Sequence, residues 1–130
     1  MEKLLYSAVV LDNESKENLI NAFTLPSKWQ PVAHHMTIGF KEPIPDYLRN
    51  DIGKTVQLTV KEIGISTDAM AVKVSGYHSN NNIPHITLAI PEGGKPFNSN
   101  FITNWTPCAP SKRILLTGKV EEIFSKGVAA

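Results

Sequence analysis

Two stretches of the sequence, HMTI at His35–Ile38 and HITL at His85–Leu88, repeat one pattern: histidine, apolar residue, threonine, apolar residue. In a β-strand, residues i and i+2 point to the same side of the sheet. The histidine and the threonine of each stretch therefore share one face, and the two apolar residues share the other. We expect each strand to bury its apolar face and to present a His/Thr pair on the opposite face.

Around these two stretches, the chain predicts short elements joined by turns. Alternating and β-branched runs predict strands at Leu4–Leu11, Val32–Phe40, Thr55–Ile65, Ala69–Val74, Ile83–Ile90 and Arg113–Phe124, the last with a bulge at Gly118. Cap and breaker residues predict a short helix that starts at Ser15 and is stopped by Pro26, a second over Pro45–Ile52, and a third from Ser99 or Asn100 through Trp105. The order β, α, β, α, β, β, β, α, β indicates an α+β fold, with a frayed tail after Phe124.

Length and charge limit the kinds of protein this chain can be. Its 130 residues suit a single domain over 1–130, and 42% apolar residues are enough for a packed core. Thirteen basic and twelve acidic residues give a net charge of +1, whereas proteins that hold long duplex nucleic acid carry a clear basic excess. We therefore expect a small phosphate-bearing ligand or the end of a nucleic acid, and a monomer.

The single cysteine, Cys108, excludes an intramolecular disulfide framework and a cysteine-rich zinc site, and we expect it to be chemically inert. No apolar run approaches the ~20 residues of a membrane helix, so we expect no membrane partner. The apolar run Leu4–Leu11 is short and is followed by acidic and amide residues, which is not the pattern of a signal peptide. These features predict a cytoplasmic protein.

Two His/Thr pairs can support the cleavage of a phosphodiester. A histidine near neutral pH can take a proton from the nucleophile, and a second one can give a proton to the leaving oxygen. Threonine hydroxyls can donate hydrogen bonds to the non-bridging phosphate oxygens and hold the phosphate in line. Two histidines without a carboxylate or cysteine in either motif are a poor zinc set, so we expect neither a metal nor a cofactor.

HHMTIGF and PHITLAI resemble the paired His-x-Thr/Ser motifs of the 2H phosphoesterase superfamily. The resemblance implies a compact two-lobed, pseudo-two-fold β-sheet core with short flanking helices, in which each lobe brings one motif strand to a central cleft. It also implies metal-independent hydrolysis of a cyclic phosphate or phosphodiester in a nucleotide, an RNA end or a cyclic oligonucleotide. Both RNA repair or processing and the degradation of cyclic oligonucleotide signals fit such a protein.

Carried over to this chain, the resemblance makes one of His35 and His85 the general base and the other the general acid. It makes Thr37 and Thr87 the phosphate-binding residues. The sequence alone does not assign which histidine has which role.

Further residues are candidates for binding the substrate. Tyr6 and Trp29 can stack on a base, although burial in the core is the usual place for an aromatic residue in a strand. Lys95 follows the second motif strand and can pair with phosphate, although its segment also fits a plain turn and helix cap. We expect His34 to point away from His35, to the opposite face of the strand, and His78 to be exposed in a loop.

Two other functions remain open on sequence alone. The same fold can bind and sequester a nucleotide without turnover. The chain can also be an unrelated α+β interaction domain in which the two motif histidines are structural. Turnover of cyclic phosphates, and convergence of His35 and His85 on one cleft, separate these possibilities.

Overall fold

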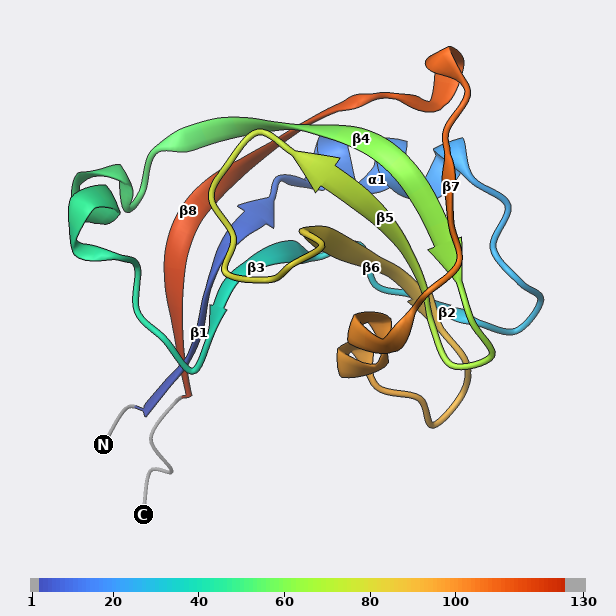
Figure 1. The fold of residues 1–130 in the computed structure, drawn as a ribbon, viewed down its shortest axis with the longest axis horizontal. Coiled ribbons are helices and arrows are strands. Elements are labelled where there is room, and N and C mark those ends of the chain that lie inside the picture. The colour runs from blue at the N-terminus through green and yellow to red at the C-terminus, as the bar shows by residue number, and fades with distance from the viewer. Residues whose placement is uncertain (1–2, 126–130) are drawn as a thin grey trace.

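Eight β-strands are the main regular elements of the structure, a computed structural model that describes residues 3–125 (Figure 1). Strands account for 44% and helices for 20%. The strands are β1 (Lys3–Leu11), β2 (Gln30–Pro31), β3 (His35–Phe40), β4 (Thr55–Ile65), β5 (Met70–Ser75), β6 (His85–Ile90), β7 (Trp105–Pro107) and β8 (Leu115–Ser125). One α-helix, α1 (Asn13–Ala22), accompanies three 3-10 helices, η1 (Asp46–Asp51), η2 (Pro96–Phe101) and η3 (Pro110–Lys112).

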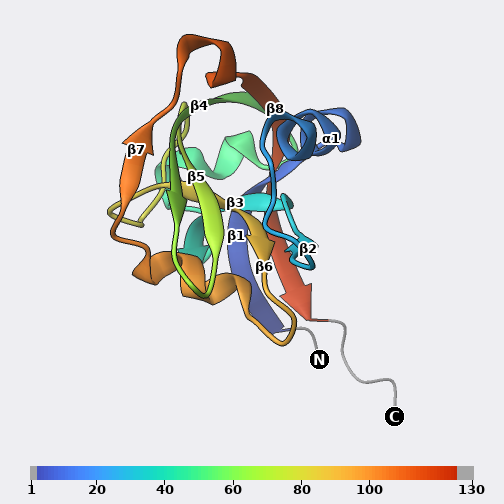
Figure 2. The same ribbon diagram turned by 90° about the vertical axis from the view of Figure 1, so that its right-hand side faces the viewer.

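Six of these strands close into an antiparallel barrel. β1 pairs with β3 on one side and with β8 on the other, and the ring continues from β8 through β4 and β5 to β6. β6 returns to β3 where Met36 pairs with Ile86, which closes the ring. β2 and β7 lie outside it, paired with β6 and β4, and Figure 2 shows β7 running beside β4.

The expected fold class was therefore wrong. The chain is mostly β and forms one closed barrel, not a two-lobed, pseudo-two-fold α+β core. Two lobes require two separate sheets, but β1 joins β3 to β8 and β5 joins β4 to β6, so the strands form one continuous ring. Alternation along a strand tells which side is buried, but it does not tell which strands are neighbours.

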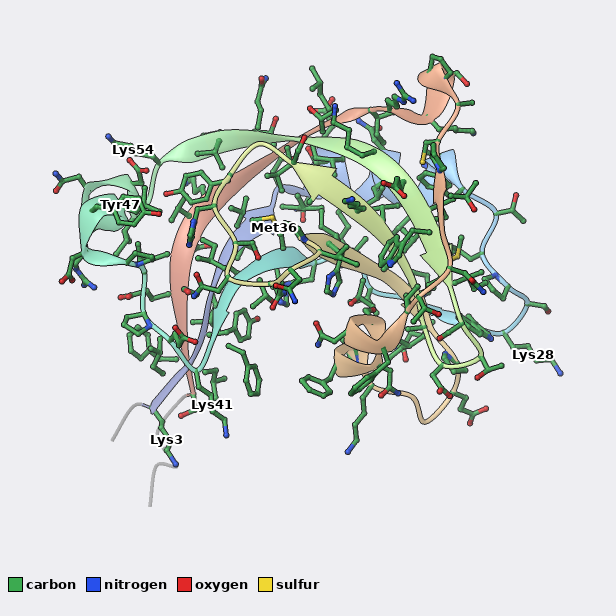
Figure 3. The ribbon with its side chains drawn as sticks, viewed as in Figure 1. Lys3, Lys28, Met36, Lys41, Tyr47 and Lys54 are labelled. Carbon is green, nitrogen blue, oxygen red and sulfur yellow. The ribbon has the colours of Figure 1, made fainter. Side chains whose placement is uncertain are left out.

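The interior of the barrel is filled by the apolar side chains that alternate along its strands. Fully buried members include Val9, Met36, Ile38, Leu58, Val60, Val72, Ile86, Leu88, Leu116 and Val120. Figure 3 shows Met36 in the middle of the ring. Burying each such side chain contributes about 1.5–3 kcal/mol, so this set holds the barrel together.

Helix α1 adds Leu19 to the same core. Its N-cap residue is Asp12, whose carboxylate accepts a hydrogen bond from the Ser15 backbone N–H at 2.8 Å. The Ser15 hydroxyl in turn accepts a hydrogen bond from the Thr117 N–H of β8 at 2.8 Å. The helix is thereby fixed to the barrel. No helix within residues 3–125 is both long and apolar enough to cross a membrane.

A second, smaller core lies where the segment from η2 to β7 covers the outer face of β5 and β6. It contains Ala69, Ala71, Ile90 and Ile102, with Val32 and Trp105 packed against them. The expected helix through Trp105 is replaced by η2, which begins at Pro96, and by β7, which begins at Trp105 itself. Trp105 can pack closely against β4 because Gly64 has no side chain: a Cβ there would lie 2.6 Å from the indole ring.

The structure confirms some of the other predictions for single strands, helices and bulges and contradicts others. The strand Thr55–Ile65 has the expected bounds, and the short helix expected over Pro45–Ile52 is present as the 3-10 helix η1. Gly118 pairs regularly with Leu11, and the irregular register of the β1–β8 pair lies between Leu4 and Tyr6 instead. The C-terminal tail beyond Ser125 lies outside the described residues.

Candidate active site

The two His-x-Thr strands are neighbours. Met36 of β3 lies opposite Ile86 of β6, and both side chains point into the barrel. The histidines and threonines therefore point outward. If this antiparallel pairing is extended by one residue on each side of Met36 and Ile86, His35 lies beside Thr87 and Thr37 lies beside His85.

All four side chains line one groove on the outside of the barrel. The groove has a volume of about 530 Å³, and its other lining residues are Tyr6, Val32, His34, Phe40, Asn81, Pro96, Phe97, Asn100 and Phe101. One of its walls is the β3–β6 pair, and the segment that begins with η2 forms another. The structure thus brings together the four residues expected to be catalytic, along with Tyr6.

His85 is the more enclosed of the two motif histidines, with 9% of its surface exposed. Its Nδ1–H donates a hydrogen bond to the carbonyl of Ile83 at 2.7 Å. In the neutral ring this bond keeps the proton on Nδ1 and leaves the lone pair on Nε2 free. Burial lowers the pKa of His85, and the bond to Ile83 partly opposes that shift. A neutral His85 can therefore accept a proton through Nε2.

His35 lies between Tyr6 and His34. Its ring stacks on Tyr6 with centroids 4.5 Å apart and planes 16° apart, and its Nδ1 lies 2.8 Å from Nδ1 of His34. Burial lowers the pKa of His35 to about 4, helped by the nearby charges of His34 and His85. His35 by itself is therefore neutral at pH 7.

His34 does not point away from His35 as expected; it lines the same groove. Pro31 pairs with Ala89 of β6. If that antiparallel register continued, His34, three residues after Pro31, would pair with Ile86, three residues before Ala89. In the structure Met36 pairs with Ile86 instead. Two extra residues are therefore accommodated before β3. Ala33 has a positive φ of 45°, and His34 lies outside regular strand geometry, where alternation no longer decides the direction of a side chain.

The two threonines differ in their hydrogen bonding. Within the described residues, the Thr37 hydroxyl has no partner and is free to donate to a ligand. The Thr87 hydroxyl lies 2.7 Å from the hydroxyl of Ser99 and donates to the Pro96 carbonyl at 3.2 Å. If the Thr87 hydroxyl gives up its hydrogen bond to the Pro96 carbonyl, it can donate to a phosphate instead. The Ser99 hydroxyl then donates to the Thr87 oxygen.

Three exposed aromatic side chains, Phe40, Phe97 and Phe101, form an aromatic rim at the groove. Phe97 joins the other two, with ring centroids 5.9 Å from Phe40 and 5.7 Å from Phe101. The ammonium of Lys41 lies 5.5 Å from the centre of the Phe40 ring, near the end of β3 (Figure 3). An exposed apolar surface of this kind beside a polar site is typical of a ligand-binding surface.

No protein-family model matches this chain, and no curated protein matches it.

The residues that line the groove include no aspartate, glutamate, lysine or arginine. The titratable residues that line the groove are Tyr6, His34, His35 and His85. Burial raises the pKa of Tyr6, and the negative charge of Glu121 raises it further. Among residues 3–125, no three His, Cys, Asp or Glu side chains gather in a way that could hold a metal ion. That the chemistry needs no metal stays a prediction.

Two of the expected substrate-binding residues do not line the groove. Trp29 packs against the barrel core, and Lys95 is exposed just before η2. His78 also lies elsewhere, with hydrogen bonds to the Tyr47 hydroxyl at 3.2 Å and to Asn80 at 2.8 Å. Cys108 is buried, and burial raises the pKa of its thiol.

Sequence reasoning missed His34, Ser99 and the aromatic rim. For Phe97 and Phe101 a signal was present: they lie four residues apart directly after Pro96, a spacing that puts two side chains on the same side of a helical turn. For His34 the sequence holds no comparable signal, because its direction follows from the register slip against β6.

Proposed function

We propose that this protein is a phosphoesterase that needs no metal and hydrolyses a cyclic phosphate or phosphodiester in a nucleotide, an RNA end or a cyclic oligonucleotide, in the cytoplasm. The observation that carries the proposal is the pairing of Met36 with Ile86, which turns both His/Thr pairs outward onto one groove. The proposal rests on this site and on its resemblance to the 2H phosphoesterase motifs, not on the fold.

In the proposed reaction His85 is the general base. Its Nε2 takes a proton from water as the water oxygen attacks phosphorus, and its Nδ1–H keeps the bond to Ile83 throughout. His35 gives a proton to the leaving oxygen as the P–O bond breaks. Thr37 and Thr87 donate hydrogen bonds to the non-bridging oxygens, where negative charge develops.

The charge of the groove favours diesters over monoesters. A phosphodiester or cyclic phosphate carries one negative charge, whereas a monoester carries up to two near neutral pH. With no lysine or arginine among its lining residues, the groove offers imidazoles, hydroxyls and the side-chain amides of Asn81 and Asn100, which suits the smaller charge. The same feature helps release of the monoester that hydrolysis of a cyclic phosphate produces.

The aromatic rim provides a place for a nucleobase next to the phosphate. Bases stack on aromatic side chains with little dependence on sequence, at about 1–3 kcal/mol per base. Phe97 and Phe101 project from η2, the same element whose Ser99 contacts Thr87. Tyr6 is stacked on His35, so its role is to support the imidazole, not to bind a base.

The test is turnover in the presence of EDTA. The purified protein is given 2′,3′-cyclic nucleotides, RNA ending in a 2′,3′-cyclic phosphate, and cyclic dinucleotides, and products are separated by chromatography. We expect cleavage of at least one of these, and a loss of about 10²–10⁴-fold in kcat in His35→Ala and in His85→Asn. Asparagine at position 85 can still donate to the Ile83 carbonyl, so this variant removes the base while keeping the local bond.

His78→Asn is the matched control, because His78 lies outside the groove, and it should keep full activity. Melting temperatures of all variants show whether a loss of activity is a loss of fold. Tight binding of a cyclic nucleotide without any turnover would replace the enzyme proposal with the sequestering module. Full activity in both His35→Ala and His85→Asn would show that the motif histidines are structural.

A further inference from the structure

The closest polar contact in the groove that the proposed reaction does not use is the one between His34 and His35. Their Nδ1 atoms lie 2.8 Å apart, and both rings line the groove. Two imidazole nitrogens can approach this closely only if one proton lies between them, because two lone pairs or two N–H groups would repel. The two rings therefore behave as one unit, called here the His34–His35 dyad.

The geometry of the chain holds the dyad in place. The positive φ at Ala33 turns the backbone just before it, and the His34 carbonyl accepts a hydrogen bond from the Leu11 N–H at 3.0 Å. Tyr6 supports the His35 ring from one face. His34 itself is exposed, so its ring can exchange protons with water while it contacts His35.

The dyad matters because His35 alone makes a poor acid. Burial and its neighbours lower the pKa of His35 to about 4, so at neutral pH the isolated ring holds a single proton. If a neutral imidazole gave up that proton, it would become an anion. To protonate a leaving oxygen near pH 7, His35 needs a second proton that arrives at Nδ1 as the first one leaves Nε2.

We propose that His34 is a proton-relay residue that supplies this second proton, an inference that rests on the proposed phosphodiester cleavage. His34, protonated at both nitrogens from solvent, donates its Nδ1 proton to Nδ1 of His35 while the Nε2 proton of His35 moves to the leaving oxygen. Afterwards His34 is neutral with its proton on Nε2, and His35 is neutral with its proton on Nδ1. Protonation of His35 Nε2 by water and return of the Nδ1 proton to His34 restore the starting state.

The surroundings leave His34 as the group best placed for this role. The other titratable groups near His35 are His85 on β6 and Tyr6 on β1, with Glu121 of β8 acting on Tyr6. His85 already donates its Nδ1–H to Ile83, and Tyr6 contacts the face of the His35 ring, not its Nδ1 edge. In the dyad His34 is therefore a positioning and proton-supplying residue that acts through His35.

Two variants separate the hydrogen bond from the proton supply. His34→Asn keeps an N–H that can donate to Nδ1 of His35 but cannot pass on a proton, and His34→Leu removes both. Each is assayed on a nucleoside 2′,3′-cyclic phosphate, whose ribose oxygen needs protonation to leave, and on a nucleoside 5′-(p-nitrophenyl phosphate), whose leaving group does not. His78→Asn is again the control.

We expect His34→Asn to lower kcat by about a hundredfold on the cyclic phosphate and to leave the p-nitrophenyl ester nearly unaffected. The alkaline limb of its pH profile should move to lower pH, toward the range where His35 takes up a proton by itself. His34→Leu should slow both substrates, because the orientation of His35 is lost as well. Equal losses on both substrates in His34→Asn, or an unmoved pH profile, would overturn the relay.

A measurement without substrate keeps this inference separate from the proposed function. Nitrogen NMR of the histidine rings reports which nitrogen carries the proton. In the intact protein we expect neutral His35 to carry its proton on Nε2 near pH 7, and we expect that preference to persist in His34→Asn and to disappear in His34→Leu. An intact protein that cleaves no phosphodiester would reject the function, whereas an active protein with His35 protonated on Nδ1 in the resting state would reject the relay alone.

Discussion

The hydroxyl oxygens of Thr87 and Ser99 lie 2.7 Å apart, and this contact joins η2 to the second motif strand. Ser99 is almost fully buried, with 1% of its surface exposed. The same 3-10 turn carries Phe97 and Phe101 of the aromatic rim. The position of the residue that would bind phosphate and the position of the surface that would bind a base are therefore coupled through the hydrogen bonds of Thr87 to η2, of which the one with Ser99 is shorter than the one to Pro96.

Removing that bond should affect both stability and substrate binding. For Ser99→Ala we expect the free energy of unfolding to fall by about 1 kcal/mol, because the buried Ser99 hydroxyl and its hydrogen bond with Thr87 are lost. We also expect KM for a cyclic nucleotide to rise more than kcat falls, because η2 and the rim lose their fixed distance from Thr87. Urea unfolding and steady-state kinetics measure the two effects. Ser111→Ala, on the exposed η3, is the control and should change neither.

Truncating the aromatic rim should weaken binding of the base and leave the chemistry intact. Phe97→Ala and Phe101→Ala should each raise KM for a nucleoside 2′,3′-cyclic phosphate by roughly five- to a hundredfold, the range that corresponds to one stacked base. Cleavage of a phosphodiester without a base, such as methyl p-nitrophenyl phosphate, should be unchanged. Phe124→Ala removes an exposed ring that does not line the groove and should have no effect on KM. A matching loss of activity on the substrate without a base would mean that the rim supports the fold instead.

Much of the local structure could be predicted from the sequence. Alternation over Thr55–Ile65 gave the bounds of β4, and the two motif strands present their histidines and threonines on the face opposite the buried residues. Asp12 and Ser15 at the start of α1 carry the cap chemistry that the sequence indicates. These features depend on residues close together in the chain, where side-chain period and capping decide the outcome.

What could not be predicted depends on contacts between distant segments. Closure of the barrel requires Met36 to meet Ile86, fifty residues later, and no local pattern encodes that pairing. The direction of His34 follows from the register slip against β6. Trp105 forms a strand because Gly64 of β4 leaves room for its ring, so a short helix was the natural but incorrect expectation.

The contact between Gly64 and Trp105 predicts a sensitive position outside the groove. In Gly64→Ala the new Cβ would lie 2.6 Å from Cε3 of the indole, so Trp105 has to move, and β7 moves with it. We expect a loss of about 1–3 kcal/mol in the free energy of unfolding, the usual cost of overpacking, together with a change in tryptophan fluorescence. The double variant Gly64→Ala with Trp105→Leu removes the clash with the indole and leaves only the 2.8 Å approach of the new Cβ to Cγ2 of Ile102. It should be more stable than the sum of the two single effects predicts, and strict additivity would argue against the contact.

The low pKa of His35 predicts how stability changes with acidity. In the unfolded chain the ring titrates near its ordinary value of about 6.5, whereas in the folded protein it titrates at about 4. Between these values the unfolded state binds more protons than the folded one, so stability is fully present above pH 6.5 and falls as the pH is lowered toward 4. Burial also lowers the pKa of His85, which adds to the loss of stability at low pH.

For His35 we expect a loss of roughly 2 kcal/mol in the free energy of unfolding over this pH window, after allowing for the partial exposure of the ring. Urea unfolding at pH 7 and at pH 4.5 measures the difference, and His35→Gln should remove a large part of it. If His35→Gln unfolds with the same pH dependence as the intact protein, the His35 ring is not held neutral by its surroundings.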